Sequence, residues 1–291
     1  MTVCKASPIG LCFGVRRAID ALEQTLSTGE TVYAIGSPIH NPQEVERLRA
    51  KGLIVVEDEN GVPDGAVAFI RAHGVAPAVV ESLKKKHARV IDGTCPFVRV
   101  VQTRARELSE AGYHVLILGD EKHPEVVGIL GYVAGSATVI SSVSSLLAST
   151  IFRNSGKIAK LGLVSQTTQQ HRLLAEVAKA ALERADELRV FNTICHATRE
   201  RQQAVAELSA QVDGLIVIGG HDSANTGKLC RIASDSGCPV QWIEHAGQLD
   251  RTWLEGKERI GVAAGASTPD WLIDELIRAV ETAARTSGGC Q

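Results

Sequence analysis

The chain has 291 residues, 31 of them basic and 33 acidic, and 44% of its residues are hydrophobic. This balance is typical of a soluble globular protein and gives no support to nucleic-acid binding. No apolar run reaches the ~20 residues that span a bilayer, and the N-terminus lacks the charged and apolar regions of a signal peptide. We therefore expect a cytoplasmic protein that binds neither membranes nor nucleic acid, folded into two or three units of roughly 100 residues each.

Six segments along the chain share one pattern. Each has a short apolar run, often β-branched, followed by a polar or glycine-bearing turn and then by apolar positions at helical spacing, which predicts a strand, a turn and a helix. In chain order, they begin at residues 31, 65, 114, 160, 214 and 259. They form three pairs, and before each pair a cysteine opens a further helix, expected over residues 13–26, 96–110 and 196–210.

The three pairs keep a common register with these cysteines. The first turns lie 28 residues after them, from Cys12 to His40, from Cys95 to His123 and from Cys195 to Ser223. The second turns follow at His73, Thr167 and Ser267. We therefore predict an α/β fold of three homologous units with mostly parallel sheets, over residues 13–94, 95–194 and 195–291, the third joined by an N-terminal strand within 1–12.

The polar turns of such units gather at the carboxyl ends of the strands, where ligands bind in open α/β sheets. A pseudo-threefold arrangement would bring the three cysteines together there. Converging thiolates need a cation between them, which predicts a metal ion or an iron-sulfur cluster. The Cys-x-x-Cys spacing common in structural zinc sites is absent, and three thiolates suit a cubane with one open iron. The alternative is that these cysteines are buried apolar side chains.

The other four cysteines, Cys4, Cys230, Cys238 and Cys290, have no counterpart in the other units and are given no function. The turns, in contrast, predict an anion site, because several helix N-termini would meet at one cavity. A diphosphate would use the donors of five turn residues: His40, His73, Ser223, Asn225 and Ser267. Ordinary caps and turn residues are the alternative for each of them. Glu125, beside His123 and Pro124, is the best candidate for a proton donor.

At these residues the sequence resembles the LytB (IspH) family of 4-hydroxy-3-methylbut-2-enyl diphosphate reductases. The similarity runs over almost the whole chain. It is carried, in family order, by GLCFGVRRAI, IHNPQEVERL, RAHGV, DGTCPFV, KHPEVVGILG, SQTTQ, TICHATRERQ, HDSANTGKL and AGASTPDWLI.

The resemblance implies a trefoil of three α/β units around a [4Fe-4S] cluster that Cys12, Cys95 and Cys195 bind, with one iron lacking a protein ligand and a [3Fe-4S] form after oxidation. It implies that His40, His73, Ser223, Asn225, Ser267 and the backbone of Ala224 hold the diphosphate. His123 and Thr167 would surround the hydroxyl end of the substrate, where Glu125 delivers protons.

The implied reaction is a two-electron, two-proton reductive dehydroxylation in the methylerythritol phosphate pathway of isoprenoid biosynthesis. The substrate alcohol binds the open iron, water leaves, and isopentenyl and dimethylallyl diphosphates result. The chain has no Gly-x-Gly-x-x-Gly turn for an internal nicotinamide or flavin. The family therefore implies a ferredoxin or flavodoxin as electron donor, and we expect a monomer or homodimer.

Three positions depart from the family pattern. Ala224 stands where a second serine is frequent, which removes one hydroxyl donor. Arg71 stands where small residues are common, and Gly93 stands where alanine is frequent. Two other classes of protein compete with the reductase interpretation. One is an iron-sulfur redox sensor that binds a phosphorylated metabolite, and the other is a mononuclear zinc hydrolase.

Overall fold

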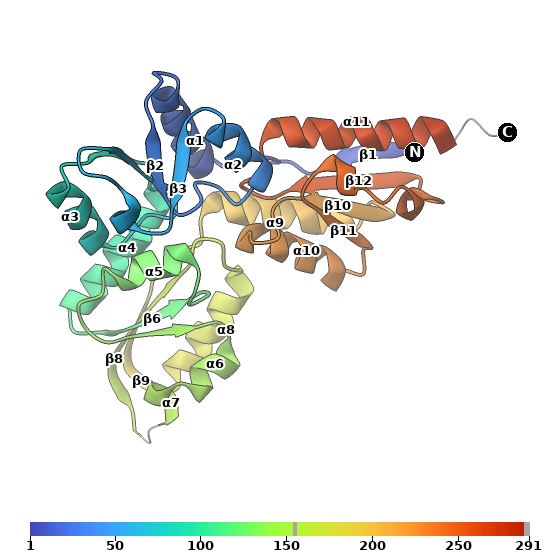
Figure 1. Cartoon of the computed structure of the whole chain (residues 1–291). Coiled ribbons are helices and arrows are strands. Elements are labelled where there is room, and N and C mark those ends of the chain that lie inside the picture. Colours follow the sequence, from blue (N-terminus) through green and yellow to red (C-terminus); the bar gives the residue numbers. More distant parts are fainter. Residues whose placement is uncertain (154–155, 288–291) are drawn as a thin grey trace. The chain divides into compact units, whose positions relative to one another are not determined.

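The computed structural model describes residues 1–153 and 156–287. Its strands form three four-stranded sheets, and every strand pairing in them is parallel. Helices alternate with the strands along the chain (Figure 1). The predicted α/β class with three parallel sheets is therefore confirmed.

The first sheet in chain order has the strand order β3-β2-β4-β5. Its strands are β2 (Val32–Ile35), β3 (Leu53–Val56), β4 (Val67–Ile70) and β5 (Arg89–Asp92). The accompanying helices are α1 (Phe13–Leu26), α2 (Pro42–Arg49), η1 (Glu59–Gly61) and α3 (Pro77–Lys85). All four residues of the central strand β4 are buried, as expected where a parallel sheet is covered on both faces.

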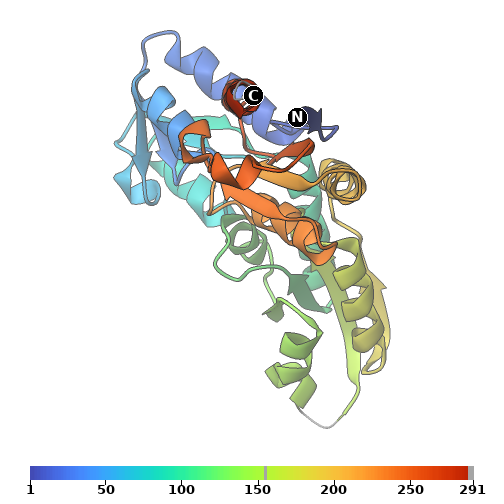
Figure 2. The ribbon, with the colours of Figure 1, turned by 90° about the vertical axis from the view of Figure 1, so that its right-hand side faces the viewer.

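The second sheet repeats this order as β7-β6-β8-β9. Its strands are β6 (His114–Leu118), β7 (Ala137–Ile140), β8 (Ile158–Ser165) and β9 (Ala185–Val190). Its helices are α4 (Pro96–Glu110), α5 (Pro124–Leu130), α6 (Val143–Ala148), α7 (Thr150–Arg153) and α8 (His171–Leu182). Leu174 and Val177 of α8 pack with Leu161 and Leu163 of β8 in one apolar core, and both views show α8 beside this sheet (Figures 1 and 2).

The third sheet has the order β1-β12-β10-β11. Its strands are β1 (Thr2–Lys5), β10 (Gly214–Ile218), β11 (Val240–Ile243) and β12 (Arg259–Ala264). Its helices are α9 (His196–Ser209), α10 (Ala224–Asp235), η2 (Ala246–Gln248), η3 (Thr252–Leu254) and α11 (Asp270–Ser287). Read from β11, the order matches the other two sheets, with β1 in the edge position of β5 and β9.

By contacts the chain divides into two compact units. One comprises residues 1–16, 39–48 and 196–291 and contains the third sheet; the other comprises residues 17–38 and 49–195 and contains the first two sheets. We call them the β12 unit and the β8 unit. None of the helices described is both long enough and apolar enough to cross a membrane.

Candidate functional site

The three cysteines of the repeat occupy equivalent backbone positions. Each directly precedes a long helix, α1, α4 or α9. Each donates its backbone N–H, over 3.0 Å, to the carbonyl of the second residue after a central strand. The bonds run from Cys12 to Ala266 after β12, from Cys95 to Ala72 after β4, and from Cys195 to Thr167 after β8. A strand end and a helix start therefore hold each cysteine in the same way.

The thiols of these cysteines differ from those deeper in the fold. The thiols of Cys12, Cys95 and Cys195 are only half-buried, and each stands at the start of a helix. Cys230 and Cys238 lie in the apolar core of the β12 unit. Burial raises the pKa of Cys230 to about 12, so its thiol stays protonated and inert. Three accessible thiols at helix starts fit the donor set of an iron-sulfur cluster.

Glu125 is bound on two sides by Thr167 in the β8 unit. The backbone N–H of Thr167 donates to Oε1 of Glu125 over 2.7 Å, and its hydroxyl donates to Oε2 over 2.8 Å. Both side chains are buried. The carbonyl of Thr167 accepts the N–H of Cys195, so one residue joins the predicted proton donor to a predicted cluster ligand. The family resemblance predicted that Thr167 and Glu125 lie in one site, but the hydrogen bonds between them were not predicted.

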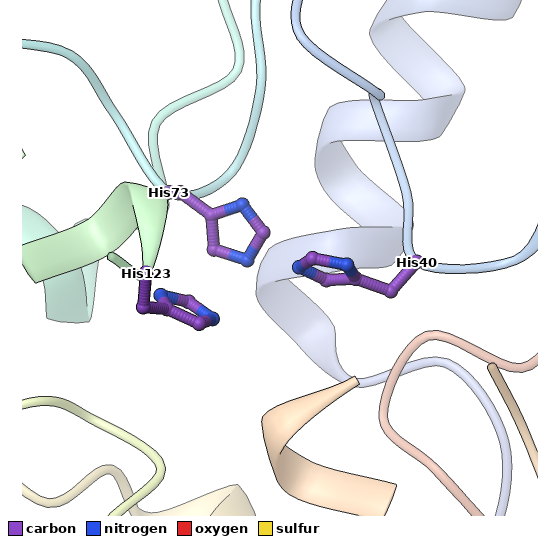
Figure 3. A group of neighbouring side chains, drawn as sticks. All are labelled: His40, His73 and His123. Atoms are coloured by element: carbon purple, nitrogen blue, oxygen red, sulfur yellow. The ribbon is translucent and has the colours of Figure 1, made fainter. Parts of the chain in front are cut away.

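His123 and His73 lie together beside this pair. His123 caps α5: its Nδ1 accepts the backbone N–H of Glu125 over 3.1 Å. This bond leaves the proton of a neutral ring on Nε2, which is then a donor. The ring of His73, from the turn after β4, stands edge-on to that of His123 with centroids 5.1 Å apart (Figure 3). The β8 unit thus brings together His73, His123, Glu125 and Thr167.

The turns after β10 and β12 gather the predicted diphosphate ligands of the β12 unit. The Ser267 hydroxyl donates to the His40 carbonyl over 3.4 Å. A Cβ atom at Gly220 would lie 2.5 Å from that carbonyl, so only glycine admits this approach. Nδ1 of the His40 ring lies 2.9 Å from a carboxylate oxygen of Asp222. His40 is therefore held at its backbone by one turn and at its ring by another.

The buried side-chain amide of Asn225 indicates a binding site for a ligand. Neither its amide nitrogen nor its oxygen has a hydrogen-bond partner among the described residues. It lies in the first turn of α10, whose N-terminal cap is Ser223. A buried amide without partners costs about 1–3 kcal/mol, which a bound anion would offset by accepting its N–H groups. Ala224 begins the same helix and has only its backbone to offer.

The strand ends correct one alignment made from the sequence. His40, His123 and Ser223 each come five residues after a strand end, so the first turns are equivalent as predicted. His73 and Ser267 come three residues after β4 and β12. The third residue after β8 is Thr168, not Thr167, because β8 ends at Ser165. Thr167 is instead equivalent to the residues whose carbonyls accept the cysteine N–H groups.

Three polar side chains in these turns were not selected from the sequence. Asp222 is the partner of the His40 ring. Asn41 and Gln166 are buried, and their amide nitrogens have no partner in the part of the chain that the structure describes. Asn41 and Gln166 belong to the family-like stretches IHNPQ and SQTTQ, a signal that could have identified both. Cys290 lies outside the described residues.

Gly93 immediately precedes Thr94 and Cys95 in a tightly packed place. A Cβ atom there would lie 2.6 Å from the Ile70 carbonyl oxygen and 3.0 Å from the Phe69 ring. We expect Gly93→Ala to destabilise the protein by about 1–3 kcal/mol, because overpacking forces neighbouring backbone to move. Urea denaturation monitored by circular dichroism measures this change, and a variant as stable as the parent would contradict the packing argument.

Asp92 stabilises the turn that carries Cys95. Its burial acts to raise the pKa of its carboxyl, but hydrogen bonds from Thr94 and the Arg99 guanidinium outweigh burial and hold that pKa below its ordinary value. A lowered pKa in the folded state stabilises the protein above the ordinary pKa of Asp, and this stabilisation is lost as pH falls through the lowered value.

We therefore expect Asp92→Asn to lose about 0.5 kcal/mol of stability at neutral pH, a small effect because solvent screens this half-exposed group. The difference between the variant and its parent should disappear in acid. Denaturation at a series of pH values checks this, and a difference that grew toward low pH would contradict the sign.

Residues 3–281 match the family model described as LytB protein. The chain is 42% identical over 281 residues to 4-hydroxy-3-methylbut-2-enyl diphosphate reductase of Geotalea uraniireducens (strain Rf4), covering 97% of each chain. It is 43% identical over 282 residues to the enzyme of the same name from Geobacter sulfurreducens, again covering 97% of each.

Two solved structures are similar in fold. The first is described as (E)-4-hydroxy-3-methyl-but-2-enyl diphosphate reductase, the terminal enzyme of the non-mevalonate pathway. It is 36% identical, with a TM-score of 0.70, over 97% of this chain and 100% of that one. The second is the E-1-hydroxy-2-methyl-but-2-enyl-4-diphosphate reductase from Plasmodium falciparum. It is 27% identical, with a TM-score of 0.86, over 95% of this chain and 86% of that one.

Proposed function

The chain belongs to the LytB family, and we propose that it is a 4-hydroxy-3-methylbut-2-enyl diphosphate reductase. It is an oxidoreductase of isoprenoid biosynthesis that removes the allylic hydroxyl of its substrate with two electrons and two protons. Isopentenyl and dimethylallyl diphosphates are the products. The observation that carries this proposal is the buried Glu125–Thr167 pair, joined through Thr167 to Cys195.

Cys12, Cys95 and Cys195 would hold a [4Fe-4S] cluster. Their half-buried thiols, their positions at helix starts and their common backbone bonds support this assignment. When bound, such a cluster supplies single electrons and an iron that acts as a Lewis acid. We propose that the three α/β units, over residues 13–94, 95–194 and 195–291, form a trefoil around it.

Glu125 would move protons at the hydroxyl end of the substrate. Its two carboxylate oxygens accept hydrogen bonds from the N–H and the hydroxyl of Thr167, which fixes the plane of the carboxyl group. A proton that Glu125 receives can pass to the leaving hydroxyl or to the allylic carbons, and the Thr167 hydroxyl, being both donor and acceptor, can rotate to accommodate either state. His123 presents Nε2–H to the same region as a further donor.

The diphosphate would be bound by the polar turns. Ser223 and Asn225 stand at the start of α10, where backbone N–H groups and the helix dipole favour anions. His40, His73, Ser267 and the backbone of Ala224 complete the proposed set. The unpartnered amide of Asn225 supports it most directly, since a phosphate oxygen would satisfy that amide.

We also propose an electron donor, a compartment and an oligomeric state. Electrons arrive singly from an external donor, for which we propose a ferredoxin or a flavodoxin. The protein is proposed to work in the cytoplasm as a monomer or homodimer.

Anaerobic turnover of 4-hydroxy-3-methylbut-2-enyl diphosphate with reduced methyl viologen tests the proposal. Formation of both isoprenoid diphosphates is the expected result. If protein with an intact cluster forms no product, the reductase assignment is rejected and an iron-sulfur sensor is favoured. A colourless protein that contains zinc but no iron would favour a hydrolase instead.

A further inference from the structure

His40 and Asp222 form a hydrogen-bonded pair. His40 is among the residues proposed to bind the diphosphate, whereas Asp222 has no role in that proposal. Nδ1 of His40 lies 2.9 Å from Oδ2 of Asp222. The His40 side chain is largely buried, whereas that of Asp222 is 63% exposed. Asp222 directly precedes Ser223, the cap of α10, so the carboxylate stands at the edge of the turn that is proposed to bind phosphate.

This contact determines which ring nitrogen of His40 carries a proton. An ionised carboxylate only accepts hydrogen bonds, so Nδ1 of His40 must donate to Asp222. Nε2, the other ring nitrogen, is buried and faces away from the carboxylate. His123 has the opposite arrangement, because its Nδ1 accepts an N–H and its proton lies on Nε2. The two histidines therefore present different chemistry to a ligand.

An anion that reaches Nε2 of His40 needs a proton there. A neutral ring with its proton on Nδ1 offers only a lone pair at Nε2, which repels a phosphate oxygen. A proton between Nε2 and the phosphate turns the ring into a cation between two anions, with Asp222 on one side and phosphate on the other. Charge-assisted hydrogen bonds of this kind are stronger than neutral ones.

The backbone carbonyl of His40 is held by the turns after β10 and β12. Ser267 donates to its carbonyl, and Gly220 lies too close to that carbonyl to carry a side chain. The hydrogen bond to Asp222 restricts rotation of the imidazole about the bonds of its side chain.

We propose that Asp222 is a positioning residue, which holds the Nδ1–H form and the orientation of His40 so that Nε2 shares a proton with the substrate diphosphate. The inference rests on the proposed function for the identity of the ligand. It predicts an unusual sign: removal of a negative charge next to an anion site should weaken binding of the anion. Simple charge repulsion predicts the reverse, tighter binding.

Inorganic diphosphate is the probe, and its binding to the anaerobic, cluster-containing protein is measured by calorimetry. We expect Asp222→Ala to weaken this binding about three- to tenfold, the modest end of the range for a charge-assisted bond, because Asp222 is largely exposed. Asp222→Asn retains an oxygen that can accept Nδ1–H and should recover most of the affinity. Asp235→Ala, at the far end of α10, removes the same charge and should leave binding unchanged.

Two further readouts separate positioning from a general loss of structure. In the His40→Ala background, Asp222→Ala should cost no additional affinity, because the residue on which it acts is gone. Nitrogen-15 NMR of the free protein should show His40 protonated at Nδ1 in the parent and a mixture of tautomers in Asp222→Ala.

Equal or tighter binding by Asp222→Ala would overturn the proposal, as would the same loss with and without His40. Turnover in the parent decides the proposed function separately. If the protein binds inorganic diphosphate in the predicted pattern but does not reduce the allylic substrate, the role of Asp222 stands and the reaction assignment fails. In an active enzyme the variant should raise KM with little change in kcat, because Asp222 is proposed to act on binding of the diphosphate.

Discussion

Replacement of Cys195 by serine is expected to remove most of the bound iron and to lower turnover at least about 100-fold. Loss of a residue that only hydrogen-bonds to a metal ligand already lowers metal affinity or activity about 10- to 100-fold. A serine hydroxyl is also a far poorer ligand for iron than a thiolate. The fold should survive, because the position is half-buried and its backbone bond to Thr167 does not involve the side chain. Iron analysis, visible absorption and circular dichroism of anaerobically purified protein check these three expectations.

Cys230→Ala is the matched control for this experiment. Cys230 is buried in the apolar core of the β12 unit, and the high pKa of its thiol keeps it from acting as a ligand at neutral pH. This variant should keep its iron and its turnover, with some loss of stability from the small cavity. Full iron content in Cys195→Ser, or loss of iron in Cys230→Ala, would contradict the assignment of ligands.

Glu125→Gln is expected to retain the cluster and substrate affinity but to lower kcat about 100- to 1,000-fold, the usual contribution of a positioned acid or base. The amide keeps one oxygen for the Thr167 N–H, and the Thr167 hydroxyl can turn to accept from the new N–H₂ group. The local structure should therefore persist while the transferable proton is lost. Steady-state kinetics with reduced methyl viologen, together with iron analysis, measure the separation.

Glu121→Gln removes the same charge from the exposed turn that leads to α5 and should behave like the parent. An effect of Glu125→Gln on KM alone would assign this residue to binding rather than to proton transfer. Activity equal to that of the parent would remove Glu125 from the mechanism altogether.

The central strands of all three sheets were predictable because each contains a short apolar run. The segments at residues 31, 65, 114, 160, 214 and 259 became β2, β4, β6, β8, β10 and β12. Edge strands were harder to recognise. β9 reads ADELRV, with charged side chains at half of its positions, because an edge strand is partly exposed to water.

In the candidate site, too, some features could be predicted from the sequence and others could not. His40, His123 and Ser223 could be selected from the sequence because each lies 28 residues after a cysteine of the repeat. The bond from Thr167 to Glu125 joins residues 42 apart, and the contact of His40 with Asp222 joins residues 182 apart. No local pattern encodes such a pairing, since it depends on how neighbouring strands place their turns.

The sequence by itself determined the α/β class, the three equivalent cysteines and the family, since all of these lie in local periodicity and in short motifs. Only the tertiary structure decided that β1 completes the third sheet, that Thr168 rather than Thr167 is equivalent to His73, and that Asp222 holds the His40 ring. The physical reason is that strand pairing and side-chain hydrogen bonds form between segments distant in the chain, where register and packing, rather than local propensity, select the partner.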